Sequence, residues 1–274
     1  MNKQPAVGIL ERLRCRAFLR TAAVAAIGAA LLIACANASP EPSVDTPPSD
    51  ATTYPNAGKT WYAASLPTAA EWISATYGNG TFVAVACGTT AAWSSDGKAW
   101  TSVSLPVDAS WACVEYGNGI FVAVAPYDAS FNTTNTVVWS SDGKTWNSAG
   151  LPASADWYSV AYGSNTFVAL ANDTTAAWSS DGKNWNSTSL PTRAAWESVG
   201  YANGVFVAAA YATATNPVGA TTGAAYSTDG MTWSSTTLPA SALWGSVAYG
   251  NGTFVAIANH DSSKAATTIA AYSN

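Results

Sequence analysis

Residues 157–191, WYSVAYGSNTFVALANDTTAAWSSDGKNWNSTSLP, decide the fold of this 274-residue chain. The segment from Trp157 to Tyr162 alternates in the manner of a β-strand. In the copy of this pattern that starts at Trp72, residues 81–86 predict a second strand, 91–95 a third and 99–104 a fourth. Asn-Gly at 79–80 and Asp-Gly at 96–97 supply the positive φ values of tight hairpin turns. Each copy therefore predicts four short antiparallel strands, and no segment after the N-terminal leader has helical periodicity.

Five such copies follow one another, each beginning with a leading tryptophan: Trp72, Trp111, Trp157, Trp196 and Trp244. A phenylalanine lies ten residues after every leading tryptophan, and a last tryptophan lies eleven residues before the next one. Only the step between the second and third strands varies, from 11 to 20 residues. Four antiparallel strands in a repeat of about 40–48 residues are typical of a propeller blade. The chain is therefore predicted to be an all-β, five-bladed β-propeller of four-stranded antiparallel blades.

The two ends of the repeat region complement each other. Residues 56–61, NAGKTW, match only the turn and fourth strand of a copy, whereas residues 267–274, TTIAAYSN, match only its third strand. We therefore expect the N-terminal strand to complete the last blade, which would pair edges that are otherwise exposed.

The first 56 residues differ from the rest. Five basic residues before residue 21 and an uncharged apolar stretch at 21–34 indicate an export signal. Leu32-Ile33-Ala34-Cys35 resembles a lipobox, which predicts a lipoprotein-type signal peptide at 1–35 with lipidation of Cys35; a cut after Ala38 is the alternative. Residues 36–56 form a Pro/Ser/Thr-rich linker that cannot bury enough apolar surface to fold. The domains are then 1–35, 36–56 and a propeller at 57–274, exported and lipid-anchored in the cell envelope (the outer membrane of a Gram-negative cell) or secreted.

Charge and cysteine content narrow the partners. Residues 36–274 hold six Lys and Arg against fifteen Asp and Glu, a net charge of −9 with a single arginine, Arg193. This balance argues against nucleic acid and anionic lipid headgroups as partners, so that membrane contact would come only from the lipid anchor. Cys87 and Cys113 are the only other cysteines after the leader, and we expect them to form a disulfide between blades one and two in an oxidising compartment.

The segment SSDGKAW at 94–100 and its copies at 140–146, 179–185 and 227–233 resemble the Asp-box of the bacterial neuraminidase repeat family, with one residue missing between Asp and Gly. This resemblance covers residues 58–274. It implies that Asp96, Asp142, Asp181 and Asp229 are structural turn residues, remote from any site. The sialidase chemistry of that family relies on three arginines, whereas residues 36–274 of this chain contain only one, Arg193. The predicted chain has five blades instead of the six usual in that family, and a five-bladed architecture resembles that of tachylectin-type lectins.

In a blade, the loop between the second and third strands and the connection from the fourth strand to the next blade lie on the same side. All length variation therefore opens onto one face, where binding residues are expected. Aromatic, Asn and Asp side chains in the long loops suit hydroxyl-rich ligands. The candidate ligand-binding residues are Tyr127, Asp128, Phe131, Asn132, Tyr211, Asn216, His260, Asp261, the five leading tryptophans and Glu115.

Several of these candidates have a second interpretation. The leading tryptophans either ring the mouth of the central channel or pack between blades. Glu115 is a carboxylate where the other copies have Thr76, Ala161, Gly200 and Ala248, and it either faces the channel or pairs with a cation. His260 is the only histidine, which argues against a metal site and against a catalytic triad. Paired carboxylates for glycoside hydrolysis could come from Glu71, Glu115, Asp156 or Glu197.

The sequence therefore predicts a monomeric, non-catalytic binding module without cofactors, which recognises a glycan or a protein through its variable loop face. The alternatives are a secreted hydrolase acting on carbohydrate and an envelope assembly factor that clamps another protein.

Overall fold

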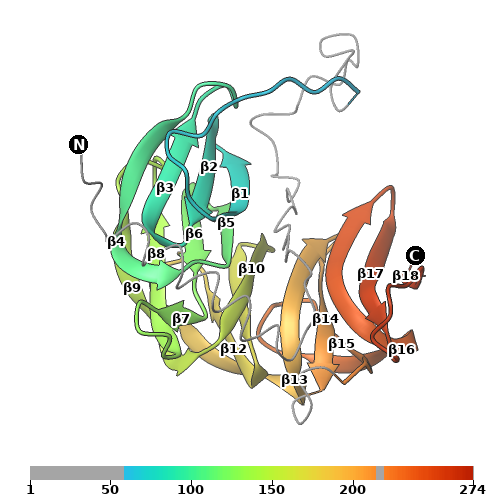
Figure 1. The fold of residues 1–274 in the computed structure, drawn as a ribbon. Coiled ribbons are helices and arrows are strands. Elements are labelled where there is room, and N and C mark those ends of the chain that lie inside the picture. Colours follow the sequence, from blue (N-terminus) through green and yellow to red (C-terminus); the bar gives the residue numbers. More distant parts are fainter. Residues whose placement is uncertain (1–58, 214–218, 274) are drawn as a thin grey trace.

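The computed structural model describes residues 59–213 and 219–273, and every regular element in these ranges is a β-strand. The predicted leader, linker and Cys35 lie outside the described residues. The strands form three hydrogen-bonded sheets, which the sequence repeat divides into five successive units (Figure 1). Unit one holds β1 (Trp72–Gly78), β2 (Thr81–Ala86), β3 (Gly88–Ser94) and β4 (Thr101–Ser110). Unit two holds β5 (Cys113–Gly117), β6 (Ile120–Val124), β8 (Thr134–Ser140) and β9 (Asn147–Ala155), with the short β7 (Tyr127–Asp128) in its loop.

Units three to five share one continuous sheet. It runs in chain order through β10 (Trp157–Gly163), β11 (Thr166–Ala171), β12 (Asp173–Ser179), β13 (Asn186–Ala202), β14 (Val205–Thr213), β15 (Thr221–Ser227), β16 (Ser234–Gly250), β17 (Thr253–Asp261) and β18 (Ala270–Ser273). The two long strands, β13 and β16, each serve as the fourth strand of one unit and the first of the next. All pairings between named strands are antiparallel, which agrees with the predicted all-β class.

The local sequence explains the hairpins. The turn between the first two strands of a unit starts at Asn79, Asn118, Asn203 or Asn251, all at positive φ, and each is followed by a positive-φ glycine. This is the geometry that two-residue hairpin turns require. The second strands β2, β6 and β11 that follow these turns are mostly buried, because both of their faces pack against neighbouring strands or units.

Neighbouring units pack through repeated contacts along their first strands. A Cβ on Gly78, Gly117 or Gly163 would lie within about 2 Å of the ring of Tyr116, Tyr162 or Tyr201 in the next unit, so only glycine fits there. The Ser74, Ser159 and Ser198 hydroxyls each accept a hydrogen bond from a backbone N–H of the following unit, at 3.1–3.2 Å. The first strands therefore stand side by side as the units turn about a common centre.

The Asp-box turns are built alike in all four copies. In the copy at 140–146, Asp142 Oδ1 accepts hydrogen bonds from the backbone N–H groups of Lys144 and Thr145, both at 2.8 Å. The Ser140 hydroxyl donates to the same oxygen at 3.0 Å and accepts from Gly143 N–H at 2.9 Å. Asp96, Asp181 and Asp229 make the equivalent bonds. Each of these carboxylates is thus occupied by its own turn.

The predicted pairing of the N-terminal strand with the last blade is not present in the described residues. Strand β18 has β17 as its only neighbour, and Trp61 and Tyr272 are 86% and 77% exposed. Ser65 instead bridges to Ala99 of unit one, and Figure 1 shows this segment away from β18. The units form an arc whose first and last members, β1–β4 and β16–β18, lie apart (Figure 1). Residues 56–58 of the expected closing strand lie outside the described residues.

Cys87 and Cys113 are both disulfide-bonded, and the described residues contain no free cysteine. Cys87 directly follows β2 of unit one and Cys113 begins β5 of unit two, which is the junction where a bridge between units was expected. None of the described residues forms a helix long and apolar enough to cross a membrane.

Candidate functional site

The four-stranded antiparallel units place their turns on two opposite faces. The box face carries the Asp-box turns and the Asn-Gly hairpins, and the loop face carries the connections between second and third strands and between units. On the box face, Lys144 and Lys183 lie over the rings of Trp93 and Trp139, each at 4.0 Å from the centroid. On the loop face, acidic residues outnumber basic ones: Glu71, Asp108, Asp128, Asp156, Asp173, Glu197 and Asp261 against Arg193 and Lys264.

A recurring β-bulge lies near the loop-face end of the first strand in most units. The register of the first strand shifts just after the leading tryptophan in units one, three, four and five. The residue in this irregularity is Ile73, Tyr158, Glu197 or Gly245. Bulges re-aim side chains and are frequent beside functional sites. Units three and four thus place a phenol and a carboxyl group at a position that is apolar or small elsewhere.

Tyr158 lies at the centre of a polar cluster contributed by units two and three. Its hydroxyl is 3.4 Å from the hydroxyl of Tyr127 on β7. Burial raises the pKa of Tyr158 well above its usual value, with further upward effects from Tyr127 and from the charges of Asp156 and Glu197. Burial also raises the pKa of Tyr127 to about 12, and the Asp156 charge adds to this effect. Both carboxyl groups therefore lie within electrostatic reach of the Tyr158 phenol.

Glu197 brings a buried carboxyl group from unit four. Burial raises its pKa to about 8, and the same carboxyl group contributes to the raised pKa of Tyr211 on the neighbouring strand β14. Tyr211 is 7% exposed, so the cluster continues along β13 and β14. At pH 7 this glutamic acid would be mostly protonated, because burial disfavours the charged carboxylate.

Several buried polar atoms of the loop face lack hydrogen-bond partners among the described residues. They are Asp156 Oδ1, Glu197 Oε2, Asn172 Oδ1 and His260 Nδ1. Asp156 and Asn172 also bind each other, since Asn172 Nδ2 donates to Asp156 Oδ2 at 2.9 Å. A buried oxygen without a partner costs stability, and such atoms are rare in folded proteins. The cluster of Tyr127, Asp156, Tyr158, Asn172, Glu197 and Tyr211 is called the acidic cluster below.

The leading tryptophans occupy the packing positions and not the mouth. Trp111, Trp157, Trp196 and Trp244 are at most 1% exposed. Their indole N–H groups donate to backbone carbonyls, such as Trp111 to Gly88 O at 2.9 Å. Burial excludes these four from ligand contact, so the ligand-binding role considered for them is wrong and the packing interpretation holds. Trp72 is half-buried and donates to Thr68 O.

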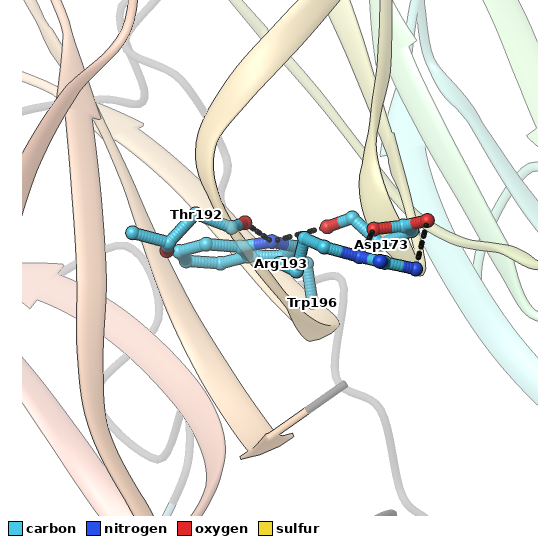
Figure 2. Close-up of polar contacts among 4 residues, drawn as sticks. All are labelled: Asp173, Thr192, Arg193 and Trp196. Atoms are coloured by element: carbon cyan, nitrogen blue, oxygen red, sulfur yellow. Dashed lines mark hydrogen bonds and ion pairs between the residues drawn. The ribbon is translucent and has the colours of Figure 1, made fainter. Parts of the chain in front are cut away.

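Figure 2 shows how one of these indoles joins two loop-face segments. Trp196 Nε1 donates to the carbonyl oxygens of Asp173 at 3.0 Å and Thr192 at 3.3 Å. The guanidinium of Arg193 then binds the Asp173 carboxylate at 2.6 and 3.0 Å (Figure 2). This ion pair is largely exposed, so it adds little to stability. It does occupy the one arginine of the propeller region.

The other predicted loop residues separate into two groups. Asp128 accepts backbone hydrogen bonds from Ser130 and Asn132, and Asp261 accepts them from residues 263 and 265, so both carboxylates hold their own loops. Phe131 and Asn132 are exposed at the tip of the unit-two loop, while Asn216 lies outside the described residues. Of the predicted residues, Tyr127 and Tyr211 join the acidic cluster, whereas His260 lies in unit five, beyond it.

Glu115 is a buried carboxyl group of a different kind. It is 3% exposed on the innermost strand of unit two, and its Oε1 accepts a hydrogen bond from Tyr116 N–H at 3.1 Å. Burial raises its pKa well above the usual value, which this single bond only partly counters. Among the described residues Glu115 forms no ion pair with Lys264 or Arg193 and no hydrogen bond to the acidic cluster, so the pairing considered for it is not seen and its role stays unassigned.

Sequence reasoning missed Tyr158 and Asn172 and did not bring Asp156 and Glu197 together. The available signal was variation within the repeat: the residue after the leading tryptophan is Ile, Ala, Tyr, Glu or Gly in the five copies. The described residues contain no group of three or more His, Cys, Asp or Glu arranged to hold a metal ion.

Comparison with known proteins supports the fold. No protein-family model and no curated protein matches the chain. Among solved structures, YCF48 bound to D1 peptide matches with a TM-score of 0.55 and 16% identity, over 73% of this chain and 64% of that one. YCF48 from Cyanidioschyzon merolae matches with a TM-score of 0.53 and 12% identity, over 72% and 66%. YjhT matches with a TM-score of 0.52 and 9% identity, over 73% and 80%.

The chain thus spans slightly less than two thirds of both YCF48 structures. At these identities the likeness establishes an all-β fold of antiparallel sheets like that of propeller proteins, and nothing about the ligand.

Proposed function

We propose that this chain is a non-catalytic binding module that recognises its ligand, a protein or a glycan, through the loop face. One observation supports this most: the carboxylates of the box face are all bound by their own turns, whereas buried acceptor atoms without partners gather on the loop face. Functional sites are where proteins tolerate such unfavourable groups. Of the two ligand classes we favour a protein, in keeping with the D1 peptide bound by the structurally similar YCF48.

Paired face variants test this proposal. Peptide and glycan arrays are probed with the unaltered protein, with Tyr158→Ala on the loop face, and with Lys144→Ala on the box face. We expect binding to a subset of probes that Tyr158→Ala abolishes and Lys144→Ala leaves unchanged. Loss of binding in the box-face variant alone would refute the assignment of the loop face.

Glycoside hydrolysis is a second candidate, because Asp156 and Glu197 both act on Tyr158 and one of them has a raised pKa. A carboxylic acid of raised pKa, such as Glu197, near a second carboxyl group is what acid–base cleavage of a glycoside requires. Release of nitrophenol from aryl glycosides, lost in Glu197→Gln, would establish this function in place of binding alone.

We also propose that the ring closes as five blades, because the first and last units keep the groups that form every other junction. A Cβ on Gly143, Gly182 or Gly230 of an Asp-box would contact Val83, Val122 or Val168 of the preceding unit. By the same pattern Gly97 would face Val255, Lys98 would lie over the ring of Tyr272, and Tyr77 would cover Gly250. Val255, Tyr272 and Tyr77 are exposed in the described structure, and nothing lies within 4 Å of a Cβ on Gly250.

The N-terminal segment is the proposed fourth strand of the last blade. In the other units the box tryptophan packs near the phenylalanine of the second strand, with ring centroids 6.4 Å apart for Phe82–Trp100, Phe167–Trp185 and Phe206–Trp233. Phe254 lacks such a tryptophan among the ring contacts of the described residues. By sequence, Trp61 corresponds to the box tryptophan of this last unit. A groove lined by Val207, Tyr226, Phe254 and Ala271 lies where the fifth box would sit.

We propose finally that residues 1–56 export the protein and tether it by a lipid on Cys35. Cys35→Ser should move the protein from the membrane fraction to the soluble fraction; unchanged membrane association would overturn this proposal.

A further inference from the structure

Three oxygen atoms of the acidic cluster are acceptors without a hydrogen-bond donor in the described residues. Asp156, Asn172 and Glu197 present oxygens that accept hydrogen bonds and have no partner in the described residues. No lysine or arginine side chain of the described residues forms an ion pair or hydrogen bond with any of them, and Arg193 on this face is bound to Asp173. A group that fills this site must therefore donate hydrogen bonds, and a positive charge would offset the desolvation of two carboxylates.

The walls of the cluster point to the same chemistry. The charge of Asp156 acts on Tyr127 and Tyr158, and the charge of Glu197 acts on Tyr158 and Tyr211, so each carboxyl group has phenol rings near it. Aromatic rings beside carboxylates stabilise cations through both their faces and the neighbouring charge. The unpartnered oxygens are buried, so the donor must sit at the end of a narrow stem. The ammonium or guanidinium of a lysine or arginine side chain has that shape.

Resting on the proposed binding function, we infer that the loop face recognises a protein partner by inserting one of its lysine or arginine side chains between Asp156 and Glu197. The bulge after Trp196 turns the Glu197 side chain away from its place in a regular strand, and the Glu197 charge acts on Tyr158 of the neighbouring unit. Charge attraction also fits the wider surface, since the acidic loop face would steer a basic partner segment toward the mouth.

Proton linkage gives this inference a signature. Glu197 is mostly protonated at neutral pH because its pKa is raised to about 8, so a bound cation must displace that proton. Affinity should therefore rise between pH 6 and 8, by at most about tenfold per pH unit, and level off above pH 8. The titratable groups near Glu197 are Tyr158 from β10, Tyr211 from β14 and Asp156. Both tyrosines have pKa values raised above the usual value, so neither phenol ionises between pH 6 and 8.

The test measures the calorimetric affinity of the protein for the N-acetylated, C-amidated peptides Gly-Gly-Lys-Gly-Gly, Gly-Gly-Arg-Gly-Gly and Gly-Gly-Gln-Gly-Gly, in which the central side chain carries the only positive charge. We expect the two cationic peptides to bind, more tightly at pH 8 than at pH 6, and the glutamine peptide not to bind. Glu197→Gln and Asp156→Asn should each weaken binding at least tenfold at pH 8. Asp108→Asn is the matched control, because it removes one exposed charge from the same face at a residue that is not part of the acidic cluster, and it should change the affinity less than threefold.

Failure of this inference can be distinguished from failure of the proposed loop-face function. Equal binding of the glutamine peptide, no binding of any of the three peptides, or equal loss in Asp108→Asn would refute recognition of a cation. The proposed loop-face function would still stand if array ligands were lost in Tyr158→Ala. Array ligands that are lost only in the box-face variant Lys144→Ala would refute both.

Discussion

Replacement of Trp61 by alanine distinguishes a closed ring from an open arc. In the described structure this side chain is 86% exposed and touches little. In a closed ring it would pack beside Phe254, as the box tryptophans Trp146 and Trp233, which are 7% and 8% exposed, pack within their own units. The same substitution therefore has very different consequences in the two arrangements.

The magnitude follows from that difference in burial. Truncation of a buried tryptophan to alanine costs about 3–5 kcal/mol. Because Trp100 and Trp185 are only half-buried, a figure of about 2–4 kcal/mol is appropriate for Trp61 in a closed ring. Truncation of an exposed side chain changes stability by at most about 0.5 kcal/mol. For an m-value of about 3 kcal/mol per M, closure predicts a loss of about 1 M in the urea midpoint.

Urea unfolding followed by tryptophan fluorescence and circular dichroism measures this shift. Tyr62→Ala is the matched control, since its counterparts Thr101, Asn147, Asn186 and Ser234 are all exposed and the side chain should face solvent in either arrangement. Trp185→Ala shows the cost of the same truncation in a complete unit. If Trp61→Ala and Tyr62→Ala unfold at the same urea concentration, the N-terminal segment does not close the ring.

Three further predictions follow from particular contacts. Asp142→Ala should destabilise the protein by about 2 kcal/mol in thermal unfolding, because two backbone N–H groups and a hydroxyl lose their shared acceptor, and peptide binding should not change. The hydrogen bond from Thr145 is the main reason why the pKa of Asp142 is lowered, so this stabilisation is present above about pH 4 and is lost as pH falls below that value. Glu197→Gln should be more stable than the unaltered protein at pH 9 and show a shrinking advantage as pH falls toward 4, because a raised pKa means that ionisation weakens the fold; equal stability at all pH values would contradict the buried carboxyl. An unreduced sample should show no alkylation of Cys87 or Cys113 by intact-mass measurement, whereas two labelled thiols would rule out the predicted bridge.

The repeat made much of the fold predictable. Residues 81–86 were predicted as a strand and form β2 with those bounds, because a turn at Asn-Gly and a run of apolar residues leave little choice. The connections between units were less predictable. Residues 186–202 form one strand, β13, since the Leu-Pro connection remains extended, and no local turn signal indicates where one unit ends and the next begins.

The site was predictable only in part, for a physical reason. The topology of a four-stranded unit predicted which face of the molecule carries the site, and the long loops on that face led to Tyr127 and Tyr211. Tyr158 and Glu197 both lie in bulges, yet the five copies have the same number of residues between the leading tryptophan and the phenylalanine. Spacing therefore gave no sign of the bulges, and these two residues could not be placed from it. Electrostatic proximity across units three and four is a property of the packed structure. The same holds for the burial of the leading tryptophans, whose two interpretations sequence could not separate.

The central claim, that the acidic cluster of the loop face binds the ligand, is tested most directly by backbone amide NMR of the protein titrated with Gly-Gly-Arg-Gly-Gly at pH 8. The account predicts that the largest shifts fall at 156–158, 172 and 195–197, while the box turns at 94–100 and 140–146 stay unchanged. Largest shifts at the box turns, or shifts spread evenly over both faces, would contradict it.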